Sequence, residues 1–348
     1  MQLNDMSIKE ALGKRQMNTP EQPAPSPLLV NGGDAFVGIE IELEDWKCNV
    51  GDWDERIATY WVEHEEGSLR NGREFVLSPP RKASSIIDAL DNFFSVGAKW
   101  NPSERASVHV HVDMTNGYTV QQFRTLFVLT YMLEGAIYRV ADENRKWASY
   151  SCPLSDMRQH RMASILAAPT AAEFKKGLVG AYHEEKYYGF NCVSLTKHGT
   201  IEFRYFPCTT DKDTIISWIN LCYDLYYTAR DVVSIDALYK TVRDMGVVRF
   251  LKQHMPKSAE ALLVYLDEED ACKRLANCVA MVNDVGLLKP LKEVSCEQQI
   301  KSVAFTRMLE KVCAPVYEEE RKIAEHDAVR VHVDELYAAL LKQAKANN

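Results

Sequence analysis

The most constraining feature of the sequence is a stretch at residues 36–44 in which apolar and acidic side chains alternate. Side chains on a strand point to opposite faces in turn, so the pattern predicts a strand with one apolar and one acidic face. The acidic face carries Glu40, Glu42 and Glu44, which repel each other and weaken strand propensity. Two interpretations stay open: a divalent metal ion such as Mg²⁺ or Ca²⁺ over the glutamates, or an edge strand with an acidic outer face.

A second stretch, at 107–113, repeats this alternation with other polar residues. Its valines fall on one face, and His109, His111 and Asp113 fall on the other. Alternation and turn residues together predict six strands: 36–44, 59–66, 72–78, 107–113, 190–196 and 200–206.

The remaining polar residues of the expected sheet are Glu74 and the pair Glu202 and Arg204. The stretches 190–195 and 200–206 are expected to form a hairpin around a short turn. An antiparallel sheet of this kind can be covered by helices on its apolar face, which leaves the polar face as the floor of an active site.

Composition and periodicity divide the chain into three segments. Residues 1–33 contain several prolines and are expected to form a flexible N-terminal tail. Residues 34–210 carry the strand patterns and form the expected catalytic domain, with helices at 83–97 and 119–145. Residues 211–348 read as a helical C-terminal region with helices at 213–231, 235–255, 258–283 and 297–345. The predicted fold class is therefore α+β, with a mainly antiparallel sheet backed by helices.

The overall composition is that of a soluble globular protein. The net charge is −8, which argues against general nucleic-acid binding. No apolar run is long enough for a membrane span, and no signal peptide is evident. The nine cysteines are scattered without a CxxC pair, which fits reduced thiols in a cytoplasm.

The polar residues of these strands suggest chemistry on phosphate. Mostly oxygen ligands with an imidazole fit Mg²⁺ or Mn²⁺ better than structural zinc. Arg204 beside a metal-binding carboxylate suits a phosphate or a carboxylate, which a guanidinium can hold with two hydrogen bonds. Metal ions and an arginine over a phosphate are the usual equipment for phosphoryl transfer.

Several motifs in this order resemble a known family. They are Gly38-Ile39-Glu40-Ile41-Glu42, Glu66-Gly67-Ser68-Leu69, residues 72–79, residues 108–113, Asn191, and Thr200-Ile201-Glu202-Phe203-Arg204. Together they resemble the amidoligase family, which belongs to the carboxylate–amine ligases related to glutamine synthetase and glutamate–cysteine ligase. The resemblance covers roughly residues 34–210. Glu66 departs from the pattern, because the family usually has aspartate there.

The resemblance implies a fold and a cofactor. The fold would be a glutamine-synthetase-like curved antiparallel sheet of about six strands. The cofactors would be ATP and about two or three Mg²⁺ or Mn²⁺ ions.

The resemblance also implies roles for the motif residues. Glu40, Glu42, Glu74, His109 and Glu202 match metal-binding positions. Nucleotide contacts are implied for His111, Ser68 and Asn191, and Arg204 would contact the γ-phosphate or an acyl phosphate.

An amidoligase would use ATP to convert a carboxylate to an acyl phosphate, which an amine then attacks. The proton acceptor stays open between Glu42, Glu44 and Glu66. Arg158 and Arg161, with Lys186, are expected either to bind phosphate or a substrate carboxylate or to form a solvated basic loop.

Two other functions stay open at this point. The His-x-His-x-Asp pattern also occurs in zinc hydrolases, and a catalytically inactive binding relative is the third option. The expected partners of a ligase are small-molecule or peptide carboxylates and amines, without membrane attachment, and a homo-oligomer is left open. Family members occur in phages and bacteria, so the expected location is the cytoplasm, that of the host if the protein is phage-encoded.

Overall fold

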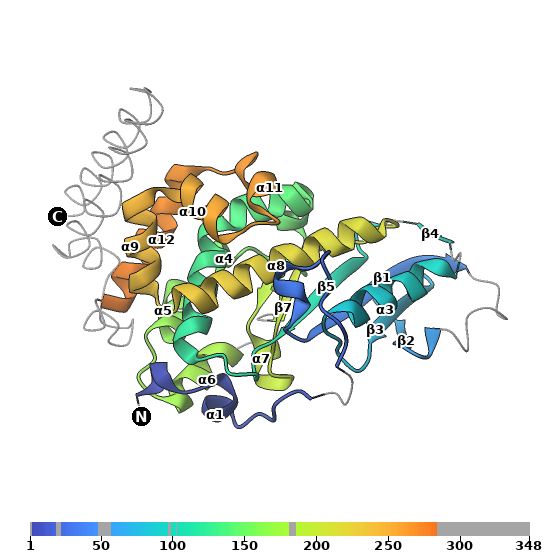
Figure 1. Cartoon of the computed structure of the whole chain (residues 1–348), viewed down its shortest axis with the longest axis horizontal. Coiled ribbons are helices and arrows are strands. Elements are labelled where there is room, and N and C mark those ends of the chain that lie inside the picture. The colour runs from blue at the N-terminus through green and yellow to red at the C-terminus, as the bar shows by residue number, and fades with distance from the viewer. Residues whose placement is uncertain are drawn as a thin grey trace.

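A computed structural model of the chain describes residues 2–18, 22–47, 57–96, 99–101, 103–180 and 186–283. Its sheet has the strand order β2-β3-β1-β5-β7-β6, and each of these neighbours pairs antiparallel. A further short strand, β4, pairs with the end of β1. The α+β class and the mainly antiparallel sheet are confirmed (Figure 1). The strands are β1 (Val37–Lys47), β2 (Trp61–Glu66), β3 (Gly72–Leu77), β4 (Lys99–Asn101), β5 (Ser107–Asp113), β6 (Phe190–Asn191) and β7 (Thr200–Pro207).

The alternating sequence patterns produce the expected two faces. Ile39 and Ile41 of β1 and Val110 of β5 are fully buried on the apolar face. In β7 the alternation is interrupted, because the pairing register with β5 shifts between Val108 and Val110. This bulge turns two consecutive residues inward, so that Tyr205 and Phe206 are both buried.

Long helices cover the apolar face. Helix α4 (Val120–Ala141) begins at Thr119, which forms a capping box with Gln122. It packs against α8 (Lys212–Val232), and both contact the central strands. Over the β1–β3 half lies α3 (Ser84–Ser95), whose Phe93 ring meets Phe75 and Trp61 at centroid distances of 5.4 and 5.1 Å. This aromatic cluster fixes α3 on the sheet.

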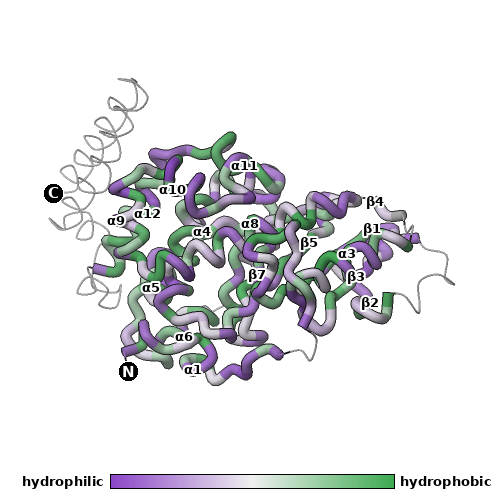
Figure 2. The backbone as a smooth tube through the Cα atoms, viewed as in Figure 1, coloured by the Kyte–Doolittle hydropathy of each residue, from purple (hydrophilic) through white to green (hydrophobic). Residues whose placement is uncertain are grey.

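Shorter helices complete the molecule. Figure 2 shows hydrophilic and hydrophobic residues interleaved along the α9–α12 end, as expected of helices with one buried face. The remaining α-helices of the described residues are α1 (Ile8–Leu12), α5 (Gln159–Leu166), α6 (Ala171–Val179), α7 (Val193–Lys197), α9 (Ile235–Met245), α10 (Val247–His254), α11 (Ala259–Leu263) and α12 (Glu268–Asn283). The 3₁₀ helices are η1 (Leu3–Asp5), η2 (Val30–Gly33), η3 (Glu143–Trp147) and η4 (Leu154–Asp156).

The N-terminal residues pack more closely than the expected flexible tail. Leu3, Ile8 and Leu12 are buried in the main core. The proline-rich stretch leads into η2, where Val30 N–H donates to Asn220 Oδ1 in α8 at 2.9 Å. These contacts hold the described part of residues 1–33 against the helices.

The structure corrects four details of the expected elements. The helix expected at 258–283 is two helices, α11 and α12. Residues 193–197 form the one-turn helix α7, so the expected hairpin arm at 190–195 is reduced to the two residues of β6. The short strand β4 was not expected. The helix expected at 235–255 breaks at Gly246, whose φ of +81° suits glycine. The helix expected at 297–345 lies outside the described residues.

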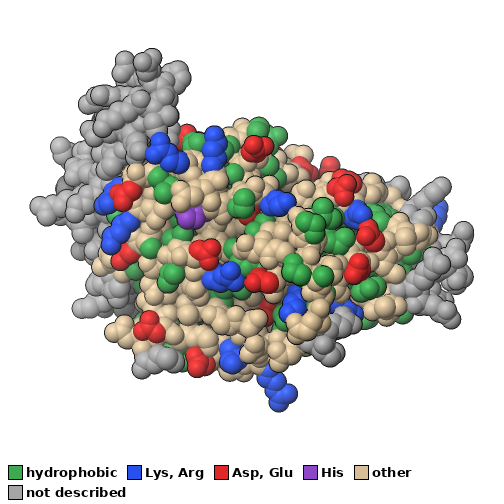
Figure 3. All heavy atoms as spheres, viewed as in Figure 1, with side chains coloured by type: hydrophobic (Ala, Val, Ile, Leu, Met, Phe, Trp, Pro, Cys, Tyr) green, Lys and Arg blue, Asp and Glu red, His purple; other side chains and the backbone are tan. Residues whose placement is uncertain are grey.

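The surface mixes both signs of charge. On the face shown in Figure 3, acidic and basic side chains are interspersed. Among the described residues, no helix combines the length and apolarity that crossing a membrane requires.

The buried carboxyl group of Asp224 makes the stability of the helical region depend on pH. In α8 it accepts hydrogen bonds from the backbone N–H groups of Lys257 and Ser258, which connects it to the start of α11. Burial raises its pKa to about 6, against the opposing effect of these hydrogen bonds. The folded state therefore keeps the proton to a higher pH than the unfolded chain, and this residue's contribution to stability falls as the pH rises towards and through about 6.

We expect Asp224→Asn to remove this pH dependence, because asparagine keeps an acceptor oxygen but cannot ionise. Between pH 4 and pH 7, the free energy of unfolding should decline by about 2–3 kcal/mol less in the variant than in the wild type. Urea unfolding at a series of pH values measures this difference. Equal slopes in the two proteins would contradict the assignment.

Candidate metal centre

The register of the strands brings the polar residues of four strands together. Glu42 of β1 lies opposite Glu74 of β3, and Glu40 of β1 lies opposite His109 of β5. On the next strand pair, His111 lies opposite Glu202 of β7. Directly opposed residues share a face of the sheet, so all of these side chains lie on the face away from α4 and α8. The sequence patterns therefore meet as one cluster.

The first group of the cluster consists of Glu40, His111 and Glu202. One ligand atom of each lies within 4.8 Å of the others. His111 Nε2 is 3.1 Å from Glu40 Oε1, and its Nδ1 is 3.0 Å from the hydroxyl of Thr200. With Nε2–H, His111 donates to Glu40; the other tautomer, with Nδ1–H donating to Thr200, would present an Nε2 lone pair to a cation, as in metal-binding histidines.

Neighbouring side chains keep this group ionised. Burial disfavours the charge on Glu40, but hydrogen bonds from His109 and His111 outweigh it and hold the Glu40 pKa far below its usual range. Burial likewise acts against the charge of Glu202, and the nearby Arg204 and histidines lower its pKa overall. Asn191 donates to Glu202 Oε2 at 2.6 Å, which fixes the orientation of that carboxylate.

The second group consists of Glu42, Glu66 and Glu74, whose oxygens also lie within 4.8 Å of one another. Burial and the charges of Glu40, Glu42 and Glu66 raise the pKa of Glu74 to about 7. The backbone N–H of Ser68 donates to Glu66 Oε1 at 2.9 Å, and hydrogen bonding from the Ser68 side chain and from this N–H lowers the Glu66 pKa. Three carboxylates at this spacing are mutually repulsive unless a cation lies between them.

His109 lies between the two groups. Its Nδ1 is 3.0 Å from Glu40 Oε2 and 3.6 Å from Glu202 Oε1. Its Nε2 is 4.0 Å from Glu42 Oε1 and has no hydrogen-bond partner among the described residues, although the side chain is only 2% exposed. A buried, unpartnered imidazole nitrogen aimed at a carboxylate is a suitable ligand atom for a cation.

Arg204 borders the first group through its side chain. Its Nη1 contacts Glu202 Oε1, and its Nε donates to the backbone oxygen of Tyr150 at 3.2 Å. The guanidinium is thus placed beside the carboxylates by both its own strand and the 145–151 segment.

Sequence reasoning missed the residues that hold Arg204. Arg145, which is 2% exposed, donates through Nη2 to Arg204 O at 3.2 Å and to Ser107 Oγ at 3.1 Å. Ser151 Oγ donates to the same Arg204 oxygen at 3.0 Å. These residues lie in an irregular stretch, where no periodicity indicates which side chains turn inward.

Several expected site residues have other contacts. Glu44 accepts a hydrogen bond from Arg70 N–H at 3.1 Å and belongs to neither group. Arg161 is buried and donates to the backbone oxygens of Gly177 and Leu178 at the end of α6. Ser68 is exposed, as is Arg158 just before α5. A role for these residues in binding phosphate stays a prediction.

Asp113 does not join the histidines of its strand. Its Oδ1 accepts hydrogen bonds from the backbone N–H and the hydroxyl of Thr115, at 2.8 and 2.7 Å. Among the described residues, the three-ligand groups contain carboxylates and His111 but not Asp113. This arrangement favours a hard divalent ion over the His-x-His-x-Asp zinc site considered above.

Divalent ions provide a direct test of the cluster. Mg²⁺ or Mn²⁺ at about 100 times the dissociation constant should stabilise the wild type by about 2.7 kcal/mol, and hence raise its melting temperature by several degrees. Glu74→Gln should lose most of this shift. Without metal, the variant should melt no lower than the wild type, because it lacks one of the repelling charges.

Glu65→Gln is the matched control, because Glu65 lies on neighbouring β2 with its side chain 89% exposed. Differential scanning calorimetry with and without a chelator measures all three proteins. A metal shift of equal size in Glu74→Gln and the wild type would rule out Glu74 as a ligand.

A family model confirms the resemblance suggested by the motifs. The family is described as "Putative amidoligase enzyme", and its model matches residues 76–226. That range contains His109, His111, Glu202 and Arg204, while the glutamates of β1 precede it. No curated protein matches the chain. Residues 76–226 of this chain therefore carry the sequence pattern of the amidoligase family.

Proposed function

We propose that this protein is an ATP-dependent carboxylate–amine ligase that forms an amide or isopeptide bond through an acyl phosphate. The observation that carries the proposal is the pairing of two ligand groups on one sheet face, with His109 between them and Arg204 at their border. The family match supports the ligase class. ATP, the acyl phosphate and the substrates belong to the proposal.

The chemistry requires activation of a carboxylate, which is a poor electrophile at neutral pH. In the proposed reaction, a carboxylate oxygen of the substrate attacks the γ-phosphorus of ATP, and ADP leaves. The amine then attacks the acyl carbon and loses a proton, and phosphate leaves. The overall reaction produces one amide, ADP and phosphate, so it needs no oxidant or reductant.

The two groups would hold divalent ions next to the nucleotide. Glu40, His111 and Glu202 would bind one ion, and Glu42 and Glu74 another with Glu66 beside it, and His109 would be available to either. When bound, Mg²⁺ or Mn²⁺ would neutralise phosphate oxygens and so favour attack on phosphorus. The oxygen-rich ligand set fits these ions, and the unpartnered Nε2 of His109 gives a further ligand atom.

Arg204 would stabilise negative charge on the transferring phosphoryl group. Its guanidinium is held on one side by Glu202 and on another by Tyr150 O, so little reorientation is needed when a phosphate binds. This is the reason to assign electrostatic stabilisation to Arg204 rather than to the basic residues Arg158 and Arg161.

Glu42 and Glu66 are both candidates to accept the proton of the amine. Glu66 lies at the end of β2, where its carboxylate is partly exposed and ionised. Glu42 is more enclosed, with its side chain 12% exposed. The amine must reach its base from solvent. We therefore propose Glu66 as the base that accepts the amine proton, and Glu42 as a metal ligand.

The proposal includes the glutamine-synthetase-like architecture that the family resemblance implies. An antiparallel sheet with helices on one face and metal ligands on the other is consistent with it. The described residues offer no observation that favours a zinc hydrolase or an inactive relative over the ligase.

The activity test measures ADP release with ATP and Mg²⁺ and pools of carboxylates and amines. Release by the wild type should require both substrates. Arg204→Lys should lower the turnover rate by about 10²–10³-fold, because lysine cannot reproduce the fixed guanidinium. Binding of a non-hydrolysable ATP analogue should weaken far less than turnover.

Glu65→Gln again serves as the control and should retain full turnover. ADP release without an amine or a carboxylate, at the same rate in the wild type and in Arg204→Lys, would contradict the ligase proposal. Amide hydrolysis that depends on zinc and not on ATP would support the hydrolase instead.

A further inference from the structure

Two buried hydroxyl groups lie at the ring nitrogen of His111 that points away from Glu40. His111 Nδ1 is 3.0 Å from Thr200 Oγ1 and 3.3 Å from Ser194 Oγ. The two hydroxyl oxygens are also 3.0 Å apart, so the three atoms lie within hydrogen-bond distance of one another. Thr200 is 3% exposed and Ser194 is 2% exposed. In the part of the chain that the structure describes, neither hydroxyl has another hydrogen-bond partner.

The turn between α7 and β7 brings these two hydroxyls together. Ser194 lies in α7, and its backbone oxygen accepts the N–H of His198 at 2.7 Å. Gly199 follows with a φ of +79°, and a Cβ atom there would lie 2.5 Å from Thr115 Cγ2, so the turn requires glycine. Thr200 then begins β7. The helical turn that replaces the expected hairpin arm therefore places Ser194 beside Thr200.

The direction of the Ser194 side chain is not the usual one in a helix. Hydroxyl groups inside helices commonly bond back to a backbone oxygen of the preceding turn. Thr196 of the same helix does so, and donates to Val193 O at 2.9 Å. Ser194 instead turns towards His111 and Thr200, so its contact with the histidine is not a by-product of helix formation.

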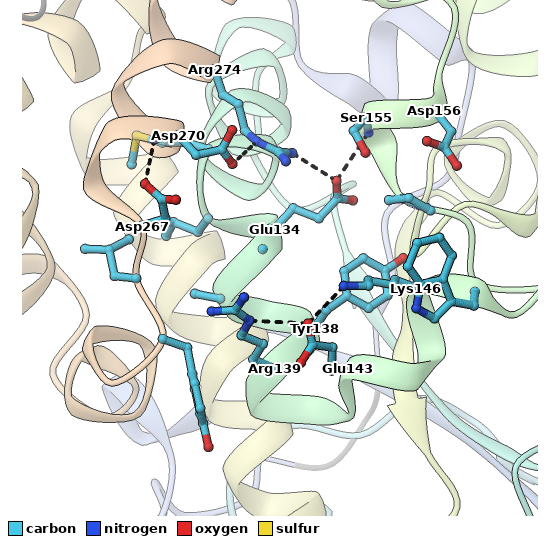
Figure 4. Close-up of a pocket in the computed structure, with 18 residues that line it drawn as sticks. Glu134, Tyr138, Arg139, Glu143, Lys146, Ser155, Asp156, Asp267, Asp270 and Arg274 are labelled. Atoms are coloured by element: carbon cyan, nitrogen blue, oxygen red, sulfur yellow. Dashed lines mark hydrogen bonds and ion pairs between the residues drawn. The ribbon is translucent and has the colours of Figure 1, made fainter. Parts of the chain in front are cut away.

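Buried polar groups elsewhere in the chain join one element to another. Figure 4 shows this at Glu134 of α4, which contacts Arg274 of α12 at 3.4 Å and accepts the N–H of Ser155 at 3.3 Å. The hydroxyl pair differs, because its shared partner is His111. The other ring nitrogen of His111 lies in the first group, 3.1 Å from Glu40 Oε1. The hydroxyl pair therefore acts on a candidate ligand.

The same distances resemble a hydroxyl–histidine–carboxylate triad, in which the hydroxyl oxygen attacks a substrate. The burial of Thr200 and Ser194 excludes this role, because a substrate cannot reach either oxygen. What remains is an effect on the histidine itself.

A hydroxyl group can donate or accept, because its hydrogen rotates about the C–O bond. While Nε2–H of His111 donates to Glu40, Thr200 can donate to Nδ1 and accept from Ser194. For Nε2 to bind a cation, the ring must carry its proton on Nδ1, and Thr200 then accepts from Nδ1 and donates to Ser194. A backbone oxygen in this place could only accept, so it would suit the second state alone.

We propose that Thr200 and Ser194 are positioning residues for the cation of the first group. The pair accepts the Nδ1 proton of His111 when Nε2 binds the ion, and it donates to Nδ1 when Nε2–H holds Glu40. The exchange of tautomers is neutral overall, since Nε2 gives one proton to water and Nδ1 takes one from water. This inference rests on the cation site of the proposed function and does not depend on turnover.

The affinity for Mn²⁺, measured by electron paramagnetic resonance without nucleotide, tests the pair. Thr200→Val removes one hydroxyl and keeps the branched shape that suits a strand. Combined with Ser194→Ala, it should weaken one class of Mn²⁺ site about 10–100-fold, the effect typical of losing the hydrogen bond behind a histidine ligand. The other class should keep its affinity. Thr200→Ser retains the hydroxyl and should bind Mn²⁺ as the wild type does.

Thr228→Val is the matched control. Thr228 of α8 is 2% exposed and donates to His254 O at 2.9 Å, so this change also deletes a buried hydroxyl with a hydrogen bond. It should leave both classes of site unchanged. Equal weakening in Thr228→Val and in the double variant would overturn the proposal. So would wild-type affinity at both classes of site in the double variant.

The tautomer can also be measured in the unaltered protein, by ¹⁵N NMR of the histidine rings at a pH where the His111 ring is neutral. Without metal, His111 should carry its N–H at Nε2. With saturating Mg²⁺, the N–H should be at Nδ1 and Nε2 should be unprotonated. An N–H that stays at Nε2 in the Mg²⁺-saturated protein would contradict the proposal even if the double variant fails to fold.

Failure of this inference differs from failure of the proposed function. Unchanged Mn²⁺ affinity in the double variant overturns the role of the hydroxyl pair and leaves the ligase proposal standing. The expected loss of Mn²⁺ affinity supports the pair even if no ligase turnover is found. Absence of Mn²⁺ binding by the wild type would overturn both.

Discussion

Repulsion among carboxylates on one face of the sheet is the constraint on which the site depends. The same strands bury Ile39, Ile41 and Val110 completely, so the glutamates cannot turn away from each other without exposing the core. Hydrogen bonds from two histidines and contact with Arg204 offset part of the repulsion in the first group. In the second group the charge is offset less, and the Glu74 pKa rises to about 7. A divalent cation would remove the remaining repulsion.

Contacts on both faces of β7 fix the strand beside the metal-ligand cluster. The segment containing Arg145 and Ser151 binds the backbone oxygen of Arg204, and Tyr150 binds its side chain. On the other side of β7, Tyr205 is bound to Glu134 in α4. Consecutive residues of one strand are thus fixed from two faces, which limits the positions that the Arg204 guanidinium can take.

Much of the fold could be predicted from the sequence because strand periodicity is a local property. The alternation in β1 and β5 identified both faces, and the same residues meet in the structure as Glu40 opposite His109. The one-turn helix α7 was read as a strand, because Val193 and Thr196 favour extended backbone and one helical turn is too short to show a period. Short β4 was missed for the same reason of length.

The composition of the two ligand groups could not be predicted from the residues alone. It depends on the register that places Glu42 beside Glu74 and on the pairing of β2 with β3 that places Glu66 near them, and both are set by tertiary packing. The inward turn of Arg145 lacks any sequence signal. Arg161 was expected to bind phosphate or a substrate carboxylate or to lie in a solvated basic loop. Its side chain is instead buried against the end of α6.

The most direct test of this account is anomalous diffraction from crystals grown with Mn²⁺ and a non-hydrolysable ATP analogue. The account predicts manganese peaks at both groups, one bounded by Glu40, His111 and Glu202 and the other by Glu42, Glu66 and Glu74. Phosphate density should lie between them and Arg204. Absence of manganese from both groups, or a single ion held by His109, His111 and Asp113, would contradict it.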